Sequence, residues 1–199
     1  MNATLRQAAK ILSLFNETSV EQVQAIIKSG FLADLRDGNI DGVNRDAFRQ
    51  LIGLKRLNIY TLLANYDRSV EEAIKAGKYN WFDNNITSNH FPSEEAGAKE
   101  VSIELVHFGR NMVTDEVLSE LDKGVRPATL KELLALGEKH PNLQREFPII
   151  ALGSVWQDLS GRRFCACLCR CGSERYLGLG SVGSKWRDYC RFAAVHKYK

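Results

Sequence analysis

The cysteines of this chain are confined to its C-terminal part. Of its 199 residues, none before position 165 is a cysteine; four cysteines then occupy alternate positions, and a fifth follows, giving Cys165, Cys167, Cys169, Cys171 and Cys190. Thiolates this close together can hold a metal ion, act as a nucleophile or redox pair, or form part of a binding surface. The spacing of the first four helps to separate these chemistries.

A metal site fits this spacing poorly. If residues 165–171 form an extended strand, positions two apart lie roughly 6.6 Å apart, and the outer pair roughly 20 Å. Zinc–sulfur bonds of about 2.3 Å in a tetrahedron place the sulfurs only about 3.8 Å from one another. No Cys-x-x-Cys pair is present. We therefore expect no metal and no other cofactor, and we keep a cuprous cluster on a coiled segment, or a cysteine-dependent enzyme, as the alternative.

Alternation on a strand separates two sets of side chains. Disulfides between positions two apart are improbable because the side chains point in parallel directions. One face would carry the four cysteines, and the other Phe164, Ala166, Leu168 and Arg170. Cysteines often serve as small core residues, but that arrangement would leave Phe164 and Leu168 outside. We expect the large apolar residues inward and at least some of the cysteines outward.

The whole chain has the composition of a globular protein. Its formal net charge of +3 arises from 27 basic and 24 acidic side chains, a balance that gives no sign of nucleic-acid binding. No apolar run approaches the roughly 20 residues that a membrane span needs. The first 20 residues read as an amphipathic helix rather than a signal peptide, and an odd cysteine count argues against a disulfide framework. We expect a cytoplasmic protein, with surface display through a partner left open.

Residues 1–57 read as a small helical module. Apolar residues recur at helical spacing over 5–15, a capping box of Thr18 and Glu21 begins a second helix that Gly30 ends, and residues 44–54 suggest a third. Such a module could bind a partner, self-associate or pack as a cap on the rest of the fold. The connecting segment 58–98 suggests a strand-like piece, a helix over 69–76 and an ordered loop.

The pattern becomes regular over residues 99–199. An alternating strand over 101–106 precedes two helices, near 115–122 and 129–138, with Thr114 capping the first and a capping box of Thr129 and Glu132 beginning the second. A buried strand near 147–158 and short strands at 164–169, 175–180 and 190–197 follow. This order predicts an α+β domain in which the final strand lies beside the first.

Three segments carry a resemblance to a known fold. They are "GVRPATLKELLALG" at 124–137, "IALGSVW" at 150–156 and "CRFAAVHK" at 190–197. With the order of elements, they resemble the C-type lectin fold, in the branch shared by formylglycine-generating enzymes and the variable proteins of diversity-generating retroelements. The resemblance covers about half the chain, and it implies a C-type-lectin-like ligand-binding domain over residues 99–199.

The resemblance also implies a function. In such variable proteins a reverse transcriptase miscopies adenines, so that asparagine codons at the 3′ end of the gene come to encode cysteine, tyrosine, serine, glycine, arginine and others. This implies a non-enzymatic protein that displays a diversified surface to a protein or other macromolecular ligand. The candidate contact residues are those placed outward on the expected strands or in the loop before the last strand: Cys165, Cys167, Cys169, Cys171, Tyr176, Ser181, Ser184, Arg187, Tyr189 and Cys190.

The other activities of related folds fit this chain less well. The formylglycine-generating relatives use cysteine chemistry but are considerably longer, and the calcium lectins have an asparagine where "WRD" at 186–188 has Arg187. We expect no catalytic residue. If the cysteines and Tyr189 are displayed, most substitutions there should change the free energy of unfolding by no more than roughly 0.5 kcal/mol.

Overall fold

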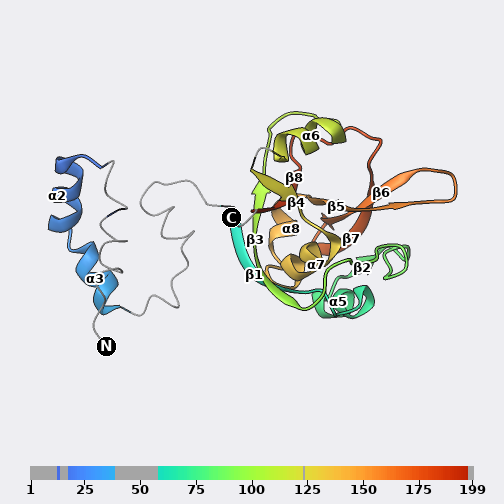
Figure 1. Ribbon diagram of the computed structural model, residues 1–199, viewed down its shortest axis with the longest axis horizontal. Coiled ribbons are helices and arrows are strands. Elements are labelled where there is room, and N and C mark those ends of the chain that lie inside the picture. Colours follow the sequence, from blue (N-terminus) through green and yellow to red (C-terminus); the bar gives the residue numbers. More distant parts are fainter. Residues whose placement is uncertain (1–12, 14–17, 39–57, 123, 197–199) are drawn as a thin grey trace. The chain divides into compact units, whose positions relative to one another are not determined.

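The computed structural model describes residues 13, 18–38, 58–122 and 124–196 (Figure 1). The chain divides into two compact units, residues 1–56 and 57–199. In the described part of the first unit, helix α2 (Val20–Lys28) is followed by helix α3 (Phe31–Asp37). Gly30, with φ of 78°, lies between them in the left-handed region that glycine tolerates. The stop at Gly30 is therefore confirmed.

The cap of α2 lies one residue later than we expected. Ser19, not Thr18, accepts a hydrogen bond from the Gln22 amide, and the Gln22 side chain accepts one from the Ser19 amide. No residue of α2 or α3 is buried, and α3 has no counterpart among our predictions. The helices expected over 5–15 and 44–54 lie outside the described residues, apart from Ser13.

The second unit is built on one large mixed sheet. Its strand order is β1-β3-β8-β5-β6-β7-β2, with β4 paired to β8. The strands are β1 (Ile59–Asn65), β2 (Trp81–Phe82), β3 (Ala98–Val106), β4 (Val125–Pro127), β5 (Ile149–Gln157), β6 (Arg163–Cys171), β7 (Glu174–Ser181) and β8 (Arg191–His196). The α+β class is confirmed.

The pairing of the strands places β8, the last strand, in the interior of the sheet. β3 and β8 pair antiparallel, with Ile103 opposite Val195, as the sequence predicted. β8 also pairs with β5 in parallel, and β5, β6 and β7 follow as an antiparallel meander. β6 is thus an interior strand with a partner on each side.

The described residues of this unit form four helices: α5 (Val70–Gly77), α6 (Thr114–Leu121), α7 (Leu130–Lys139) and α8 (Leu143–Glu146). α7 begins at the expected capping box, in which Thr129 and Glu132 cap each other's amides. The cap of α6 is different. Val113 occupies the cap position, and the Thr114 hydroxyl instead donates to the Val182 carbonyl at 2.6 Å. No helix in the described ranges has the length and apolar content to cross a bilayer.

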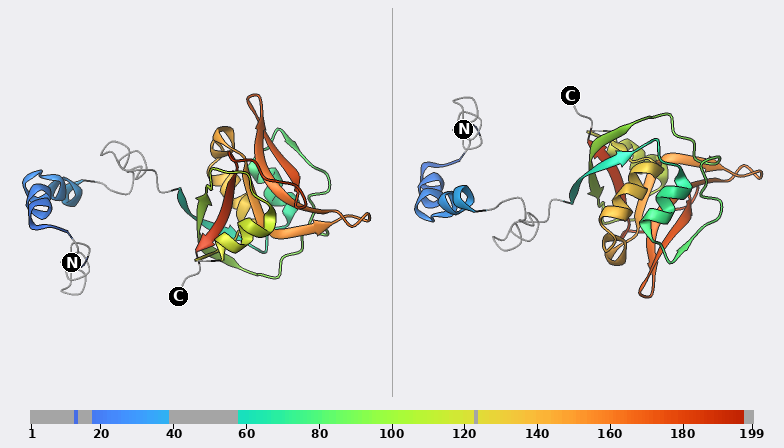
Figure 2. Two further views of the ribbon diagram at one scale, coloured as in Figure 1. Left: turned by 90° about the horizontal axis from the view of Figure 1, so that it is seen from above. Right: turned by 90° about the horizontal axis from the view of Figure 1, so that it is seen from below.

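Two hydrophobic cores lie on opposite faces of the sheet. The first is closed by α5 and α7 and contains Ile103, Ile149 and Leu168 from the strands. The second is closed by α6 and residues 182–190, and it contains Ile150, Cys165 and Phe192. In Figure 2, α6 is nearer the viewer in the view from above, and α5 and α7 are nearer in the view from below. β6 therefore contributes side chains to both cores.

The segment 58–98 belongs to the same compact unit as residues 99–199. It supplies β1, which pairs antiparallel with β3 at one end of the sheet, and β2, which pairs in parallel with β7 at the other. Its helix α5 is capped by Ser69, where we expected the helix to begin, and it buries Val70 and Ile74. The aromatic stretch that we expected to be loop is largely turns, but it contains β2.

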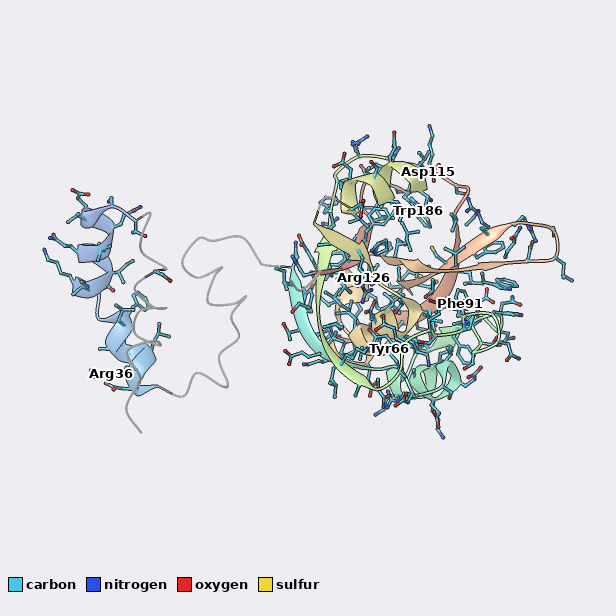
Figure 3. The ribbon with its side chains drawn as sticks, in the orientation of Figure 1. Arg36, Tyr66, Phe91, Asp115, Arg126 and Trp186 are labelled. Atoms are coloured by element: carbon cyan, nitrogen blue, oxygen red, sulfur yellow. The ribbon has the colours of Figure 1, made fainter. Side chains whose placement is uncertain are left out.

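A buried ion pair ties α7 to the sheet. The Glu132 side chain is fully buried and accepts two hydrogen bonds from Arg126 of β4, at 2.6 and 3.0 Å, and one from the Tyr66 hydroxyl at 2.6 Å. Figure 3 shows Arg126 and Tyr66 among the elements around α7. The Thr129 amide donates to the same carboxylate at 2.7 Å. Burial alone would raise the pKa of Glu132, but these hydrogen bonds outweigh it and leave the pKa lowered.

Candidate ligand-binding face

The register of the β6–β7 hairpin brings most of the candidate residues together. Each cysteine of β6 lies opposite one residue of β7, and such pairs share a face of the sheet. We call this set the cysteine face: Cys165 opposite Gly180, Cys167 opposite Gly178, Cys169 opposite Tyr176, and Cys171 opposite Glu174. The cysteine side chains thus stand beside two glycines and then beside larger residues toward the turn of the hairpin.

Burial falls steadily along the cysteine face. Cys165 is 0% exposed, Cys167 and Cys169 are half-buried, and Cys171 is exposed. On the opposite face Ala166 and Leu168 are buried and Phe164 is half-buried, as we expected. The prediction that at least some cysteines point outward holds for Cys171. The outward position expected of Cys165 as a candidate contact residue is wrong, because β6 has a core on both sides there.

Trp186 covers the buried end of the cysteine face. Its ring lies over Gly180, where an added Cβ would come within 2.9 Å of two ring carbons. The indole N–H donates to the Thr114 hydroxyl at 2.9 Å, and the Trp186 and Met112 backbones exchange hydrogen bonds. Figure 3 shows Trp186 between α6 and the sheet. Trp186 is therefore a core residue.

The outer end of the face continues onto β2. Trp81 pairs with Tyr176, and the two rings lie 5.3 Å apart between centroids. Trp81 is 47% exposed, so the pair forms an aromatic ledge beside Cys169. The sequence did not identify Trp81 as a site residue. The aromatic pair "WF" at 81–82 was the only signal, and the parallel pairing of β2 with β7 has no local signature.

The remaining candidates lie after β7, in residues 182–190, which we call the display loop, and at the end of β7 itself. Ser184, Arg187 and Tyr189 are exposed, and Ser181 is half-buried. Cys190 is 7% exposed and packs in the second core with Trp186. Its expected outward position is therefore wrong. It is the last residue before β8, and its side chain points into the same core as Phe192, two positions later.

A shallow hollow of about 340 Å³ lies beside Tyr189. It is lined by His107, Gly109, Glu146, Phe147, Asp188, Tyr189 and Arg191. The Arg191 guanidinium lies 4.8 Å above the Phe147 ring, and His107 Nε2 donates to the Asp188 carbonyl at 2.7 Å. These contacts hold the base of the display loop and leave the Tyr189 ring 57% exposed. The hollow offers both charged and aromatic groups to a ligand.

Cys167 and Cys169, in the middle of the cysteine face, have pKa values shifted in opposite directions. A hydrogen bond with Cys169, together with burial, raises the pKa of Cys167 well above its usual value. The same hydrogen bond lowers the pKa of Cys169 to about 7. The raised pKa favours the protonated form of Cys167, the more buried of the two. Burial raises the pKa of Cys165 to about 12 and also raises that of Cys190.

The chemistry open to this face is that of thiols, aromatic rings and hydroxyls. All five cysteines are free thiols. Among the residues that the structure describes, no three His, Cys, Asp or Glu side chains are grouped so that they could hold a metal ion. Comparisons with protein-family models, with curated proteins and with solved structures found no match to this chain.

Proposed function

We propose that this protein is a non-enzymatic ligand-binding protein whose binding surface is the outer part of the cysteine face together with the display loop. The observation that carries the proposal is convergence. The candidates of β6, Tyr176 of β7 and the display loop lie on one side of the sheet, and of these all but Cys165 and Cys190 are exposed or half-buried. Ser181 is the exception, because it lies opposite Phe164 and therefore on the other face. The exposed or half-buried set is rich in tyrosine, serine and cysteine, whose side chains give contact area and adaptable hydrogen bonds.

We further propose that the domain is C-type-lectin-like. The strand order supports this assignment. Within residues 99–199 the first and last strands, β3 and β8, pair antiparallel, and two longer helices, α6 and α7, lie between β3 and β5. Across the sheet, β8 lies between β3 and β5, and β5 is the first strand of the β5–β6–β7 meander. In this arrangement the display loop and the cysteine face belong to the meander end of the sheet, where the resemblance implies the diversified ligand site.

The proposal implies a ligand of macromolecular size. The surface is broad and open, with an aromatic ledge at Trp81 and Tyr176, a hollow beside Tyr189, and exposed Ser184 and Arg187 between them in the chain. Exposed aromatic rings and arginines are the side chains that dominate protein–protein binding energies. A protein surface would use more of these features at once than a small molecule could.

The test is the DNA around the coding sequence. We expect a near-copy of the 3′ end of the gene beside a reverse transcriptase gene, differing almost only at adenines in the codons of the exposed candidates. The codons of Leu168, Leu177 and Phe192, which are buried, serve as the internal control and should match in the two copies. A locus without such a copy, or with differences spread evenly over both sets of codons, would contradict the proposal.

A cysteine-dependent enzyme is the second candidate, favoured by the lowered pKa of Cys169. The two functions make opposite demands on that residue. A catalytic thiol must be present in every natural copy of the gene, whereas a diversified position must vary between copies. Sequencing the gene from related isolates therefore separates them, because an invariant Cys169 beside variable neighbours would favour the enzyme.

A further inference from the structure

β1 is the outermost strand at one end of the sheet, and β2 is the outermost at the other (Figure 1). The backbone groups of β1 alternate between β3 and the open edge. The Asn58 carbonyl accepts a hydrogen bond from the Leu105 amide, and the Tyr66 amide donates to the Gly97 carbonyl, so the even-numbered residues pair with β3. The odd-numbered residues of β1, all of them exposed, therefore turn their N–H and C=O groups toward the open edge.

One carbonyl of this edge has a side chain as its donor. Lys139, in the last turn of α7, donates from Nζ to the Thr61 carbonyl at 3.0 Å. A further strand of the sheet would place a backbone N–H at this position. Lys139 is exposed, and among the described residues its ammonium group forms no ion pair. Lys139 therefore occupies the position that a further strand would use.

A hollow of about 420 Å³ lies between this edge and the helices α5 and α7. Apolar side chains from all three elements form part of its lining, among them Leu62 of β1, Ala73 of α5 and Ala135 of α7. The charged residues of the lining are three cations and one carboxylate: Arg68, Lys131, Lys139 and Glu138. A side chain that enters the hollow from the edge of β1 thus meets an apolar surface with basic groups beside it.

The carboxylates of this chain do not balance the basic groups of the hollow. Arg68 is paired with Glu138 at 2.5 Å. Lys131 donates to the Arg68 carbonyl, as Lys139 does to a carbonyl of β1. The two carboxylates in the first turn of α5 accept hydrogen bonds from serine hydroxyls. The hollow is therefore complementary in charge to an acidic group and would disfavour a basic one.

We propose that β1 binds an extended segment of a partner protein as a further strand, and that an acidic side chain of this segment takes Lys139 from the Thr61 carbonyl. That carbonyl then accepts a hydrogen bond from the backbone of the segment, and an ion pair forms beside it. Alternate side chains of the segment enter the hollow. The others lie on the face of Ile59 and Leu63, which are apolar and 37% and 64% exposed. The segment therefore alternates acidic and apolar residues.

A second copy of β1 fits this edge less well than an acidic segment does. The sequence of β1, Ile-Tyr-Thr-Leu-Leu-Ala-Asn, has no acidic residue, so it cannot supply a carboxylate to Lys139. Antiparallel pairing of two copies about Thr61 would also bring the two Lys139 ammonium groups together, and like charges repel. The partner is therefore a different chain.

The experiment titrates the full-length protein with a blocked synthetic peptide, Thr-Glu-Val-Glu-Thr-Glu-Val, to about 1 mM, the range of weak peptide binding. Backbone amides are followed by NMR. We expect the amides of Ile59, Thr61 and Leu63 to shift and to exchange more slowly with solvent, while amides bonded to β3 change less. Methylation of the valine amides, which would face β1, should abolish binding. Methylation of the glutamate amides, which would face away, is the matched control and should be tolerated.

Two pairs of variants separate backbone pairing from charge. Thr61→Pro removes an N–H that faces the edge, and proline is tolerated there. Thr61→Val loses the same hydroxyl but keeps the N–H. We expect binding at least about 10-fold weaker for the first and less than about 2-fold weaker for the second. Lys139→Glu should weaken binding of the glutamate peptide ~5-fold and strengthen binding of a lysine-substituted peptide ~5-fold. Lys185→Glu, the same change of charge in the display loop, should do neither.

Several results would overturn the proposal. They are no binding at the highest peptide concentration, binding that methylation of the valine amides leaves unchanged, and shifts confined to the display loop. Edge amides that are already protected in the free protein would show that β1 is covered by its own chain or by a second copy, and light scattering would tell these two apart. The methylated peptides act on the wild-type protein, so the test stands even if Thr61→Pro fails to fold. None of these results involves the cysteine face, so the proposed function can fail separately.

Discussion

The two faces of β6 are held in place in different ways. On the α7 side, Leu168 lies opposite Leu177, both are fully buried, and α7 closes over them along the hairpin. On the cysteine side only one end is closed, by Trp186 and α6, and burial decreases from Cys165 to Cys171. The comparison suggests that the α7 side carries the stability of the hairpin. The outer cysteine side is left with few packing constraints, as a variable binding surface requires.

The largest expected effect is at the closed end of the cysteine face. Cys165→Asp would place a carboxylate in a fully buried position whose neighbours in the second core are apolar. Without a partner the new carboxyl must stay protonated or disrupt the core, so the free energy of unfolding should fall by about 4 kcal/mol or more. Denaturant unfolding of the purified variant measures this loss.

Cys171→Asp is the matched control, because it is the same substitution on the same face of the same strand. Cys171 is exposed beside the hairpin turn, so the free energy of unfolding should change by no more than about 0.5 kcal/mol. Similar losses for the two variants would mean that burial along the face is uniform. The contrast between the closed and open ends would then be wrong.

A middle-sized effect is expected on the α7 side, from Glu132→Gln. The change keeps the shape of the side chain but removes the charge that Arg126 neutralises through two hydrogen bonds. Breaking a buried pair typically costs 3–5 kcal/mol, and because the Arg126 side chain is 34% exposed we expect about 3 kcal/mol. Glu138→Gln on the same helix is the control. Its partner Arg68 and Glu138 itself are more than a third exposed, so its loss should stay below about 1 kcal/mol.

The pH dependence of that difference provides a second measurement. The folded-state pKa of Glu132 is lowered, so its contribution is fully present above the unfolded pKa of about 4.3 and is lost as pH falls through the folded value. The stability gap between wild type and Glu132→Gln should therefore be constant from pH 7 to pH 5 and narrow below about pH 4. A gap that stays constant down to pH 3 would show that the carboxylate does not supply it.

Local signals in the sequence predicted much of this fold. The alternation of Val101, Ile103 and Leu105 gave β3, and the capping box of Thr129 and Glu132 gave α7. Near the start of α2 two adjacent pairs fit the same pattern, Thr18 with Glu21 and Ser19 with Gln22, and the sequence could not choose between them. β3 and α7, each marked by one unambiguous local signal, therefore lie where the sequence predicted them.

The burial of the cysteines could not be predicted in the same way. Alternation separates the two faces of a strand, but it does not reveal whether one face or both are covered. The cover over Cys165 comes from Trp186 in the display loop and from Val117 and Leu121 of α6, which are distant in sequence. The exposed position of Cys171 follows from its place at the end of the hairpin, which the strand order could indicate. Trp81 was missed because a two-residue parallel strand has no periodicity to detect.

The smallest expected effect concerns the two glycines of the cysteine face. It shows how far along this face the cover formed by Trp186 and α6 extends. At Gly180 a Cβ would lie 2.9 Å from the Trp186 ring, which its hydrogen bond to Thr114 and its burial hold in place. Gly180→Ala should therefore lower the free energy of unfolding by about 1–2 kcal/mol. At Gly178 a Cβ would lie 3.6 Å from the Cys167 sulfur, which is ordinary contact. Gly178→Ala should be neutral or stabilising by up to about 0.5 kcal/mol, because alanine loses less backbone entropy on folding. Thermal midpoints of the two variants, compared with wild type, measure this difference. Equal losses of stability would mean that the covered part of the cysteine face extends beyond Gly178, toward Tyr176.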